Sequence, residues 1–144
     1  MSPVNAANQP DVPQGFKDWW STTVEPWWRD FDYLGHVTAA SYAAIYEQAF
    51  AEFVAERWHT SEPSYVVARL DITYLREIRP RNTPLRIHVS IGHTGRTSLT
   101  AAMVLCDVEG LPRSIARARY CAWDREQRTT RPLTTEERTG LATS

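Results

Sequence analysis

The clearest pattern of hydrophobic and polar positions lies between Ala39 and Arg57, where apolar side chains recur on one face of a helix. They follow the spacing i, i+3, i+4, i+7, i+8, i+11 and i+12 at Tyr42, Ile45, Tyr46, Ala49, Phe50, Phe53 and Val54. Thr38 stands at the N-cap position, where its hydroxyl can accept a hydrogen bond from an unpaired backbone N–H. The pattern predicts an amphipathic helix over residues 39–57, with a helix stop in the Ser-Glu-Pro sequence at residues 61–63.

After residue 63 the period changes from that of a helix to that of strands. Four segments rich in β-branched and aromatic residues are predicted strands: 64–75, 84–93, 97–108 and 113–124. In the second of these, apolar and polar residues alternate, the apolar ones being Leu85, Ile87, Val89 and Ile91. This alternation is typical of a strand with one packed face and one polar face, the polar one carrying His88.

The last two predicted strands flank a Glu-Gly pair at 109–110, which is expected to form a hairpin turn. Such a turn pairs Cys106 near Arg113. It pairs Cys121 near Ser98, about 25 Å from Cys106 at 3.3 Å per residue. The two cysteines are therefore expected to be small buried groups and not a disulfide.

A further strand is expected before the helix, from about Thr22 to Arg29. Pro26 restricts it to a sheet edge or a bulge, because proline cannot donate a ladder hydrogen bond. Four of the six tryptophans lie between positions 19 and 28. So much aromatic surface requires cover from the domain or from a partner subunit.

The order of elements is thus one strand, one long helix and four strands. A single amphipathic helix can cover five strands only if the sheet curls around it. The sequence therefore predicts an α+β fold with a five-stranded antiparallel sheet wrapped around one long central helix. The predicted boundaries are a flexible N-terminal arm at 1–20, this domain at 21–135 and a C-terminal tail at 136–144.

Composition and charge narrow the classes of function. The 144 residues fit one domain, and 16 Lys and Arg against 17 Asp and Glu leave a net charge of −1. That balance argues against a nucleic acid or a membrane surface as partner. No apolar run reaches the roughly 20 residues of a membrane span, and residues 1–16 lack the basic start and apolar centre of a signal peptide. A cytoplasmic location is expected.

Candidate chemistry gathers directly before the long helix, in the sequence DFDYLGHV at residues 30–37. A helix start presents unpaired N–H groups and a partial positive charge, which suit an oxyanion. Asp32 lies six residues before Thr38, so a short loop can return its carboxylate to the helix start. Gly35 allows the tight turn that this return needs. Asp30 is expected to shape the turn, and Asp32 to be ionised at pH 7.

The four histidines do not predict a metal site. His36 is expected to orient the loop by hydrogen bonding, since no second ligand stands at a metal-binding spacing. His59, His88 and His93 are scattered along the chain. Neither a metal nor a cofactor is predicted.

The spacing D-x-x-G-H-V-x-x-x-x-Y-x-x-x-x-E is formed by Asp32, Gly35, His36, Val37, Tyr42 and Glu47. This spacing resembles the hotdog-fold acyl-CoA thioesterases, in the 4-hydroxybenzoyl-CoA thioesterase-like branch. The resemblance extends over about residues 22–133 and includes the Tyr-Leu pair at 74–75. The chain has Thr-Ala at 38–39 where many relatives have two asparagines, and Arg-Glu at 76–77 where they have Pro-Ala.

The resemblance implies hydrolysis of acyl-CoA thioesters, with Asp32 as the catalytic carboxylate and the Ala39 N–H as oxyanion donor. His36 and Glu47 are further catalytic candidates, Glu47 because a related branch carries its working carboxylate on this helix. Glu47 can instead serve in an ion pair at an interface. Residues expected to contact the substrate are Gly35, Val37, Thr38, Tyr42, Arg76 and Arg96, of which the two arginines, with Arg79 and Arg81, suit the phosphates of coenzyme A.

The resemblance also implies a homodimer or homotetramer that joins sheets edge to edge, with the site between subunits. The thioester can be carried by coenzyme A or by acyl carrier protein. Whether Asp32 acts as a base toward water or as a nucleophile stays open. Two other functions also stay open: a hydratase or dehydratase that uses His36 with Asp32, and a module that binds acyl thioesters without turnover.

Overall fold

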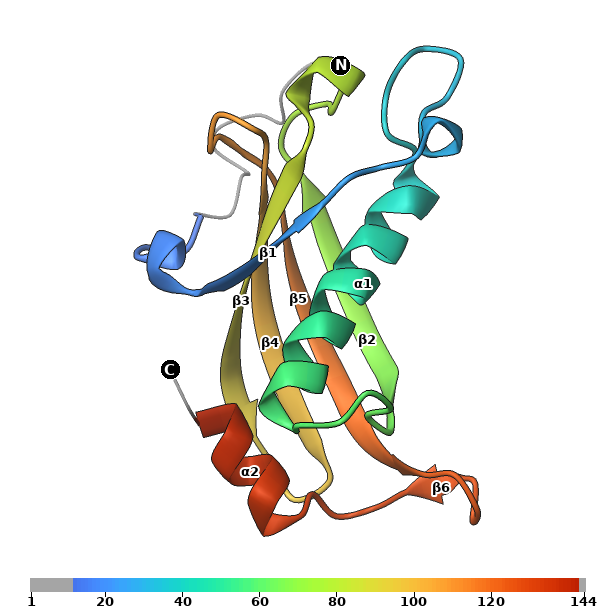
Figure 1. Ribbon diagram of the computed structural model, residues 1–144, viewed down its shortest axis with the longest axis vertical. Coiled ribbons are helices and arrows are strands. Elements are labelled where there is room, and N and C mark those ends of the chain that lie inside the picture. The colour runs from blue at the N-terminus through green and yellow to red at the C-terminus, as the bar shows by residue number, and fades with distance from the viewer. Residues whose placement is uncertain (1–11, 143–144) are drawn as a thin grey trace.

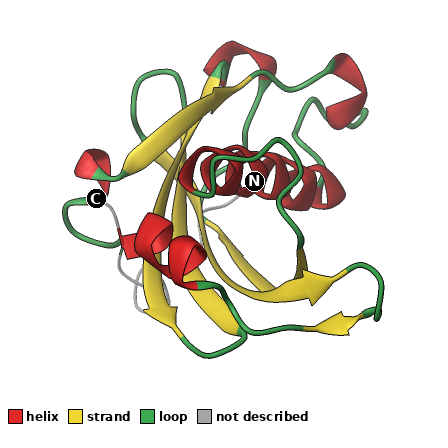
Figure 2. Ribbon diagram, turned by 60° about the horizontal axis from the view of Figure 1, so that its bottom comes forward, coloured by secondary structure: helices red, strands yellow, loops and turns green. Residues whose placement is uncertain are grey.

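A long helix, α1 (Ala39–Arg57), lies against the concave face of a curled antiparallel sheet (Figure 1 and Figure 2). The structure is a computed structural model that describes residues 12–142. The strands are β1 (Trp20–Val24), β2 (Tyr65–Tyr74), β3 (Leu85–Thr94), β4 (Ser98–Cys106) and β5 (Pro112–Asp124). Their order is β1-β3-β4-β5-β2, and the short β6 (Thr129–Thr130) pairs with the end of β5. The predicted α+β hotdog fold is confirmed.

Helix α1 has the predicted bounds, and every residue of its apolar stripe is buried. Its N-cap is Thr38, whose Oγ1 accepts a hydrogen bond from Ser41 N at 3.2 Å. At the other end, Trp58 caps the helix and His59 turns the chain with a left-handed φ of 52°. The chain therefore turns out of the helix before it reaches the Ser-Glu-Pro sequence that was predicted to stop it. Within residues 12–142, no helix is long and apolar enough to cross a membrane.

The core is the interface between α1 and the middle of the sheet. The Phe50 ring stacks on Tyr120 of β5 with 3.6 Å between centroids, and Tyr65 of β2 meets Phe50 edge-on at 5.3 Å. The buried Tyr46 hydroxyl is hydrogen-bonded to Ser114 Oγ of β5 at 2.6 Å, so this polar atom is satisfied inside the core. These contacts fix the rotation of the helix about its axis, because turning it would expose the rings.

The hairpin between β4 and β5 has the predicted register. Cys121 pairs with Ser98, and Cys106 pairs with Pro112, one residue from the predicted partner. Gly110 lies in the turn with a φ of 88°. Both cysteines are buried free thiols, as predicted.

The first strand is shorter than predicted. β1 ends at Val24, and residues Trp28–Asp30 form a 3-10 turn instead of continuing the strand. Pro26, which cannot donate to the ladder, lies just beyond the strand end. β1 is an edge strand, as the proline predicted.

The outer face of β3 is less exposed than its alternation predicts, and the domain begins earlier than expected. His88 is buried, and the ring of Phe16 packs edge-on against it at 5.1 Å. Phe16 also joins Val104 and Cys106 in a second cluster outside the main core. The later part of the predicted arm thus belongs to the domain, while residues 1–11 lie outside the described residues.

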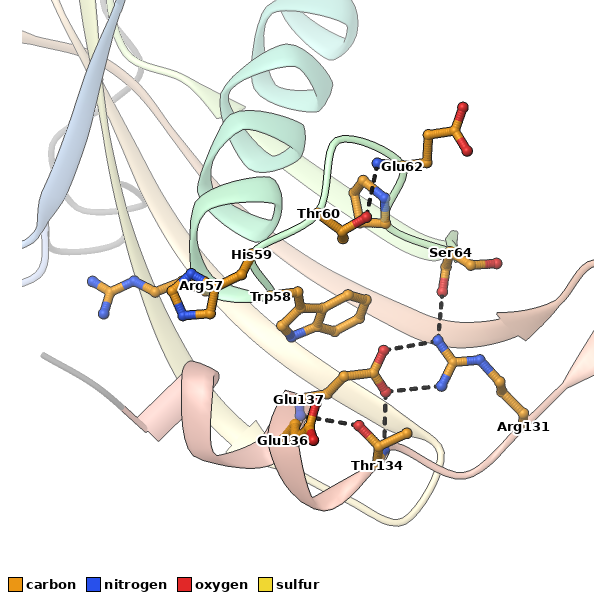
Figure 3. Close-up of a pocket in the computed structure, with 11 residues that line it drawn as sticks. Arg57, Trp58, His59, Thr60, Glu62, Ser64, Arg131, Thr134, Glu136 and Glu137 are labelled. Atoms are coloured by element: carbon orange, nitrogen blue, oxygen red, sulfur yellow. Dashed lines mark hydrogen bonds and ion pairs between the residues drawn. The ribbon is translucent and has the colours of Figure 1, made fainter.

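The segment predicted as a C-terminal tail folds as helix α2 (Thr135–Ala142), whose Leu141 is buried in the main core. Arg131 anchors this helix by donating to both carboxylate oxygens of Glu137, at 2.8 and 2.9 Å (Figure 3). Glu137 Oε1 accepts from Thr134 N, and Thr134 Oγ1 accepts from Glu137 N, which caps the helix start. The predicted domain boundary at residue 135 therefore cuts a packed element.

The Arg131–Glu137 pair borders a pocket of about 400 Å³ between α2 and the end of α1 (Figure 3). Burial alone would raise the pKa of Glu137, but hydrogen bonds from Arg131 and Thr134 outweigh it and hold the pKa below its ordinary value. Arg131 and Glu137 satisfy each other's charge at this pocket, so the pair fastens α2 to the domain.

We expect Glu137→Gln to lower the free energy of unfolding by about 2 kcal/mol at pH 7, because Arg131 then loses its anionic partner. The folded-state pKa of Glu137 is depressed, so its stabilisation is present above the unfolded pKa and is lost as pH falls through the folded value. Urea titrations should thus show a smaller difference at pH 3 than at pH 7. Glu126→Gln, at an exposed glutamate, is the control, and an equal difference at both pH values contradicts the assignment.

Candidate active site

The start of α1 is open, and its first two backbone N–H groups are uncommitted. Ala39 and Ala40 are exposed, and neither N–H donates a hydrogen bond within residues 12–142. Ser41 N and Tyr42 N both donate to Thr38 O, at 3.0 and 3.2 Å. The unpaired N–H groups and the helix dipole together favour an anionic oxygen at this position.

Asp32 closes the turn that precedes the helix. Its Oδ1 accepts hydrogen bonds from Leu34 N at 2.9 Å and from His36 N at 3.1 Å. Its backbone N donates to His36 O at 2.8 Å, and Gly35, with a φ of 81°, donates to Asp32 O at 3.0 Å. Asp32 Oδ2 accepts no hydrogen bond from residues 12–142. One carboxylate oxygen therefore shapes the turn, and the other accepts no hydrogen bond from the described residues.

Asp30 is the carboxylate that is hydrogen-bonded to the first turn of α1. Its Oδ1 accepts from Ser41 Oγ at 2.9 Å, and its Oδ2 accepts from Trp27 N at 2.7 Å. Its main-chain O accepts from Thr38 N at 2.9 Å. Asp30 shapes the turn, as predicted, whereas no hydrogen bond within residues 12–142 joins Asp32 to the helix. Sequence reasoning missed Ser41, because its contact with Asp30 crosses a loop that has no period.

His36 is tied to the β2–β3 connection as well as to its own turn. Its Nε2 lies 2.8 Å from Glu77 Oε2, and the two side chains are 27% and 26% exposed. Beside this pair, Val37 N donates to Ile78 O at 3.0 Å. Sequence reasoning singled out His36 but missed its partner Glu77. Among the described residues, no group of three His, Cys, Asp or Glu side chains is placed to hold a metal ion.

Glu47 is a second candidate carboxylate, on α1 beside the edge strand β2. Its Oε1 is buried with no hydrogen-bond partner among residues 12–142, and so is the hydroxyl of Tyr120. Burial raises the pKa of Glu47, and the neighbouring Tyr120 hydroxyl offsets only part of this. Burial and the nearby Glu47 together raise the pKa of Tyr65 to about 12. Glu47 and Tyr65 line a groove of about 640 Å³ that also includes Val66 and Val67 of β2.

The other predicted substrate contacts are not gathered at one place. Val37 and Tyr42 are buried, and Tyr42 packs edge-on against Tyr74 at 4.8 Å, so both support the site from the core. Arg76 is exposed on the β2–β3 connection, near the turn that holds His36. Arg96 lies in the β3–β4 turn, which is beside α2 at the opposite end of the sheet (Figure 1). A single chain therefore does not bring Arg96 together with Asp32.

Exposed aromatic side chains flank the same loop. Trp28 is 88% exposed and Tyr33 is 95% exposed. Trp27 is also exposed, and the Arg29 guanidinium lies 4.2 Å from its ring centroid. The cover predicted for the tryptophans is thus incomplete in one chain.

The sequence model of the thioesterase-like superfamily matches residues 26–137. A thioesterase from Thermus thermophilus, complexed with coenzyme A and Zn, is similar in structure with a TM-score of 0.73 and 24% identity, over 84% of this chain and 90% of that chain. A hypothetical protein from Staphylococcus aureus in complex with CoA has a TM-score of 0.76 and 15% identity, over 86% of this chain and 82% of that chain. A 1,4-dihydroxy-2-naphthoyl-CoA thioesterase from Synechocystis has a TM-score of 0.71 and 12% identity, over 84% of this chain and 93% of that chain. No curated protein matches the sequence significantly.

We expect Asp30→Ala to lower the free energy of unfolding by about 1–2 kcal/mol, because Ser41 and Trp27 N lose their acceptor and the helix start loses a nearby negative charge. Chemical denaturation measures this loss. Glu126→Ala removes an exposed carboxylate away from the helix start and is expected to change stability by less than about 0.5 kcal/mol. An Asp30→Ala variant as stable as wild type contradicts the role given to Asp30.

Proposed function

The chain belongs to the thioesterase-like superfamily, and we propose that it hydrolyses acyl-CoA thioesters to a free acid and coenzyme A. The observation that carries the proposal is that an exposed helix start follows a turn whose carboxylate has only one of its two oxygens hydrogen-bonded. Ala39 and Ala40 have uncommitted N–H groups, and the neighbouring turn leaves one oxygen of Asp32 without a hydrogen bond from residues 12–142. Thioester hydrolysis needs these two kinds of group, a donor for an oxyanion and a base or nucleophile.

In the proposed reaction the thioester carbonyl oxygen points at the start of α1. Attack on the carbonyl carbon moves a negative charge onto that oxygen, and the Ala39 N–H stabilises it. Fixed backbone donors of this kind contribute about 10²–10³ in rate each, because they need no reorganisation when the charge appears. The buried stripe of α1 and the Thr38 cap hold this donor in place.

Asp32 is proposed to react through its Oδ2, either as a base toward water or as a nucleophile. As a base it takes a proton from water, and the resulting hydroxide displaces the thiolate of coenzyme A. As a nucleophile it attacks the thioester carbon and expels the thiolate of coenzyme A, which leaves an anhydride that water cleaves to the free acid and the regenerated carboxylate. The hydrogen bonds from Leu34 and His36 to Oδ1 fix the carboxylate in either case.

We assign the coenzyme A phosphates to the arginines of the β2–β3 connection. Arg76, Arg79 and Arg81 are exposed there, and Val37 N donates to Ile78 O of the same connection. Guanidinium groups bind phosphate through paired N–H donors. The Thermus thermophilus and Staphylococcus aureus structures each hold coenzyme A, which supports this class of substrate. A phosphopantetheine group on acyl carrier protein would use the same cations.

Glu47 is proposed to act across a subunit interface. It lies eight residues beyond Ala39, about 12 Å along the helix axis, too far to share a carbonyl with that N–H within one chain. β2 is an edge strand, so pairing with a second copy would cover its open ladder and the adjacent groove lined by Glu47. We therefore propose a homodimer in which Glu47 faces the partner's site.

A hydratase or dehydratase that uses His36 with Asp32 has less support. The His36 imidazole pairs with Glu77, whereas only its backbone N–H reaches Asp32. An acyl-thioester-binding module without turnover would keep the same groups. Thiol release distinguishes both from hydrolysis.

Asp32→Asn is expected to lower kcat/KM for acyl-CoA hydrolysis by about 10³-fold or more, because the amide is neither base nor nucleophile. Its oxygen can still accept from Leu34 N and His36 N, so the free energy of unfolding should change by less than about 1 kcal/mol. Free thiol released from a panel of acyl-CoAs measures the first quantity, and urea titration the second.

Asp32→Ala is the companion variant, since it removes the turn hydrogen bonds as well as the charge. It should lose both activity and stability. Full activity in Asp32→Asn contradicts the proposed chemistry. Binding of the ester without thiol release by wild type indicates a binding module, and consumption of an unsaturated acyl-CoA without thiol release indicates a hydratase.

Ala39→Pro is expected to lower kcat by about 10²–10³-fold, because proline removes the backbone N–H proposed to bind the oxyanion. Proline is well tolerated at the first position of a helix, and Thr38 already has the extended conformation that precedes proline. Ala39→Gly keeps the N–H and is the matched control. Equal kcat values in the two variants, measured with thermal unfolding to verify folding, contradict the assignment.

A further inference from the structure

We propose that Glu77 is a positioning residue that holds the Asp32 turn through His36 and is itself held by Arg113. This inference rests on the proposed thioester hydrolysis and adds a support for its carboxylate. It follows from a continuous series of contacts that begins at a buried carboxylate in the β4–β5 hairpin and ends at Asp32 Oδ1.

The series begins at Asp107, a buried residue whose two carboxylate oxygens both accept hydrogen bonds. Its Oδ2 lies 2.8 Å from both Nε and Nη2 of Arg113. Its Oδ1 accepts from Glu109 N and Leu111 N, each at 2.9 Å. Burial alone would raise the pKa of Asp107, but the hydrogen bonds from Leu111, Arg113 and Glu109 outweigh it and hold the pKa below its ordinary value. The Arg113 guanidinium thus has a fixed, charged partner.

Arg113 then fixes the backbone of the β2–β3 connection. Its Nη1 donates to Glu77 O at 2.9 Å. Its own main-chain O accepts from Leu75 N at 3.0 Å and from Arg76 N at 3.1 Å. Three hydrogen bonds therefore hold residues 75–77 against one residue of β5, which leaves the Glu77 side chain pointing from an anchored backbone.

Glu77 and its neighbour hold the turn before the helix at two adjacent points. Glu77 Oε2 meets His36 Nε2 at 2.8 Å, and Ile78 O accepts from Val37 N at 3.0 Å. The backbone N–H of the same His36 donates to Asp32 Oδ1 at 3.1 Å. A change in the position of His36 therefore moves an oxygen of the proposed catalytic carboxylate.

The Glu77–His36 pair is too exposed to stabilise the fold much, since ion pairs in contact with water contribute little. Its effect is expected on geometry instead, because small displacements of a reacting group cost much of its rate. A positioning role then predicts a fall in kcat with nearly unchanged KM and nearly unchanged thermal stability. A merely structural role would lower the melting temperature, and a solvent-facing pair would change none of these quantities.

The experiment is a double-variant cycle of Glu77→Ala, His36→Ala and their combination, assayed by thiol release beside wild type. Each single variant is expected to lower kcat roughly 10- to 100-fold, with KM within about twofold. The combination should be no worse than the single variants, because both remove the same contact. Glu77→Gln, whose amide oxygen can still accept from His36, should recover most of the rate. Glu109→Gln, at a glutamate in the same hairpin as Asp107, is the control and should leave kcat unchanged.

Amide hydrogen exchange gives a readout that does not depend on turnover. In Glu77→Ala, the N–H groups of Leu34 and His36 should lose protection, because both donate to Asp32 Oδ1. The proposal is overturned by unchanged protection, by additive losses in the cycle, or by a Glu77→Ala variant with wild-type kcat. If wild type releases no thiol, or Asp32→Asn stays active, the proposed function fails instead, and the exchange result still decides whether Glu77 holds the turn.

Discussion

Helix α1 has one apolar stripe and the curled sheet has one hollow face, and each can be buried only against the other. The stack of Phe50 on Tyr120 and the hydrogen bond between Tyr46 and Ser114 fix the rotation of the helix inside the sheet. Because the rotation and depth of the helix in the sheet are set, its first turn lies at the end where Ala39 is exposed to solvent. The same burial that stabilises the fold therefore positions the backbone donors of the proposed site, and no loop has to carry them.

Two carboxylates in three residues divide the work at this helix start. Asp30 uses both oxygens, on Trp27 N and on the Ser41 hydroxyl, so it is committed to structure. Asp32 uses one oxygen for its turn. A structural role for Asp32 does not compete with the proposed chemical one, because the bonds to Oδ1 fix the direction of Oδ2. Such preorganisation lowers the cost of reaching the transition state, since the carboxylate need not be reoriented when it reacts.

Periodic features of the sequence predicted the fold well. The sequence did not predict contacts between segments that have no period. The helix bounds at 39–57, the hairpin register and the edge position of β1 follow from repeating patterns and from proline. The burial of His88 depends on Phe16, which lies outside the predicted domain. The link from Ser41 to Asp30 and the pair of His36 with Glu77 likewise depend on how loops meet in space. Arg96 was grouped with the site by residue type alone, and the sheet places it at the far end.

Glu47 is the one carboxylate among residues 12–142 with a buried oxygen that has no hydrogen-bond partner, and its position supports the proposed dimer. A buried carboxylate oxygen without a partner is costly, and a raised pKa reduces that cost only by favouring the neutral form. The same side of the molecule carries β2, whose backbone ladder is open toward solvent. In the proposed dimer a second sheet edge would pair with β2 and bring polar groups to the groove that Glu47 lines. The same pairing would then cover the open strand edge and provide partners for the Glu47 carboxylate, so the proposed chemistry and the proposed dimer depend on one interface.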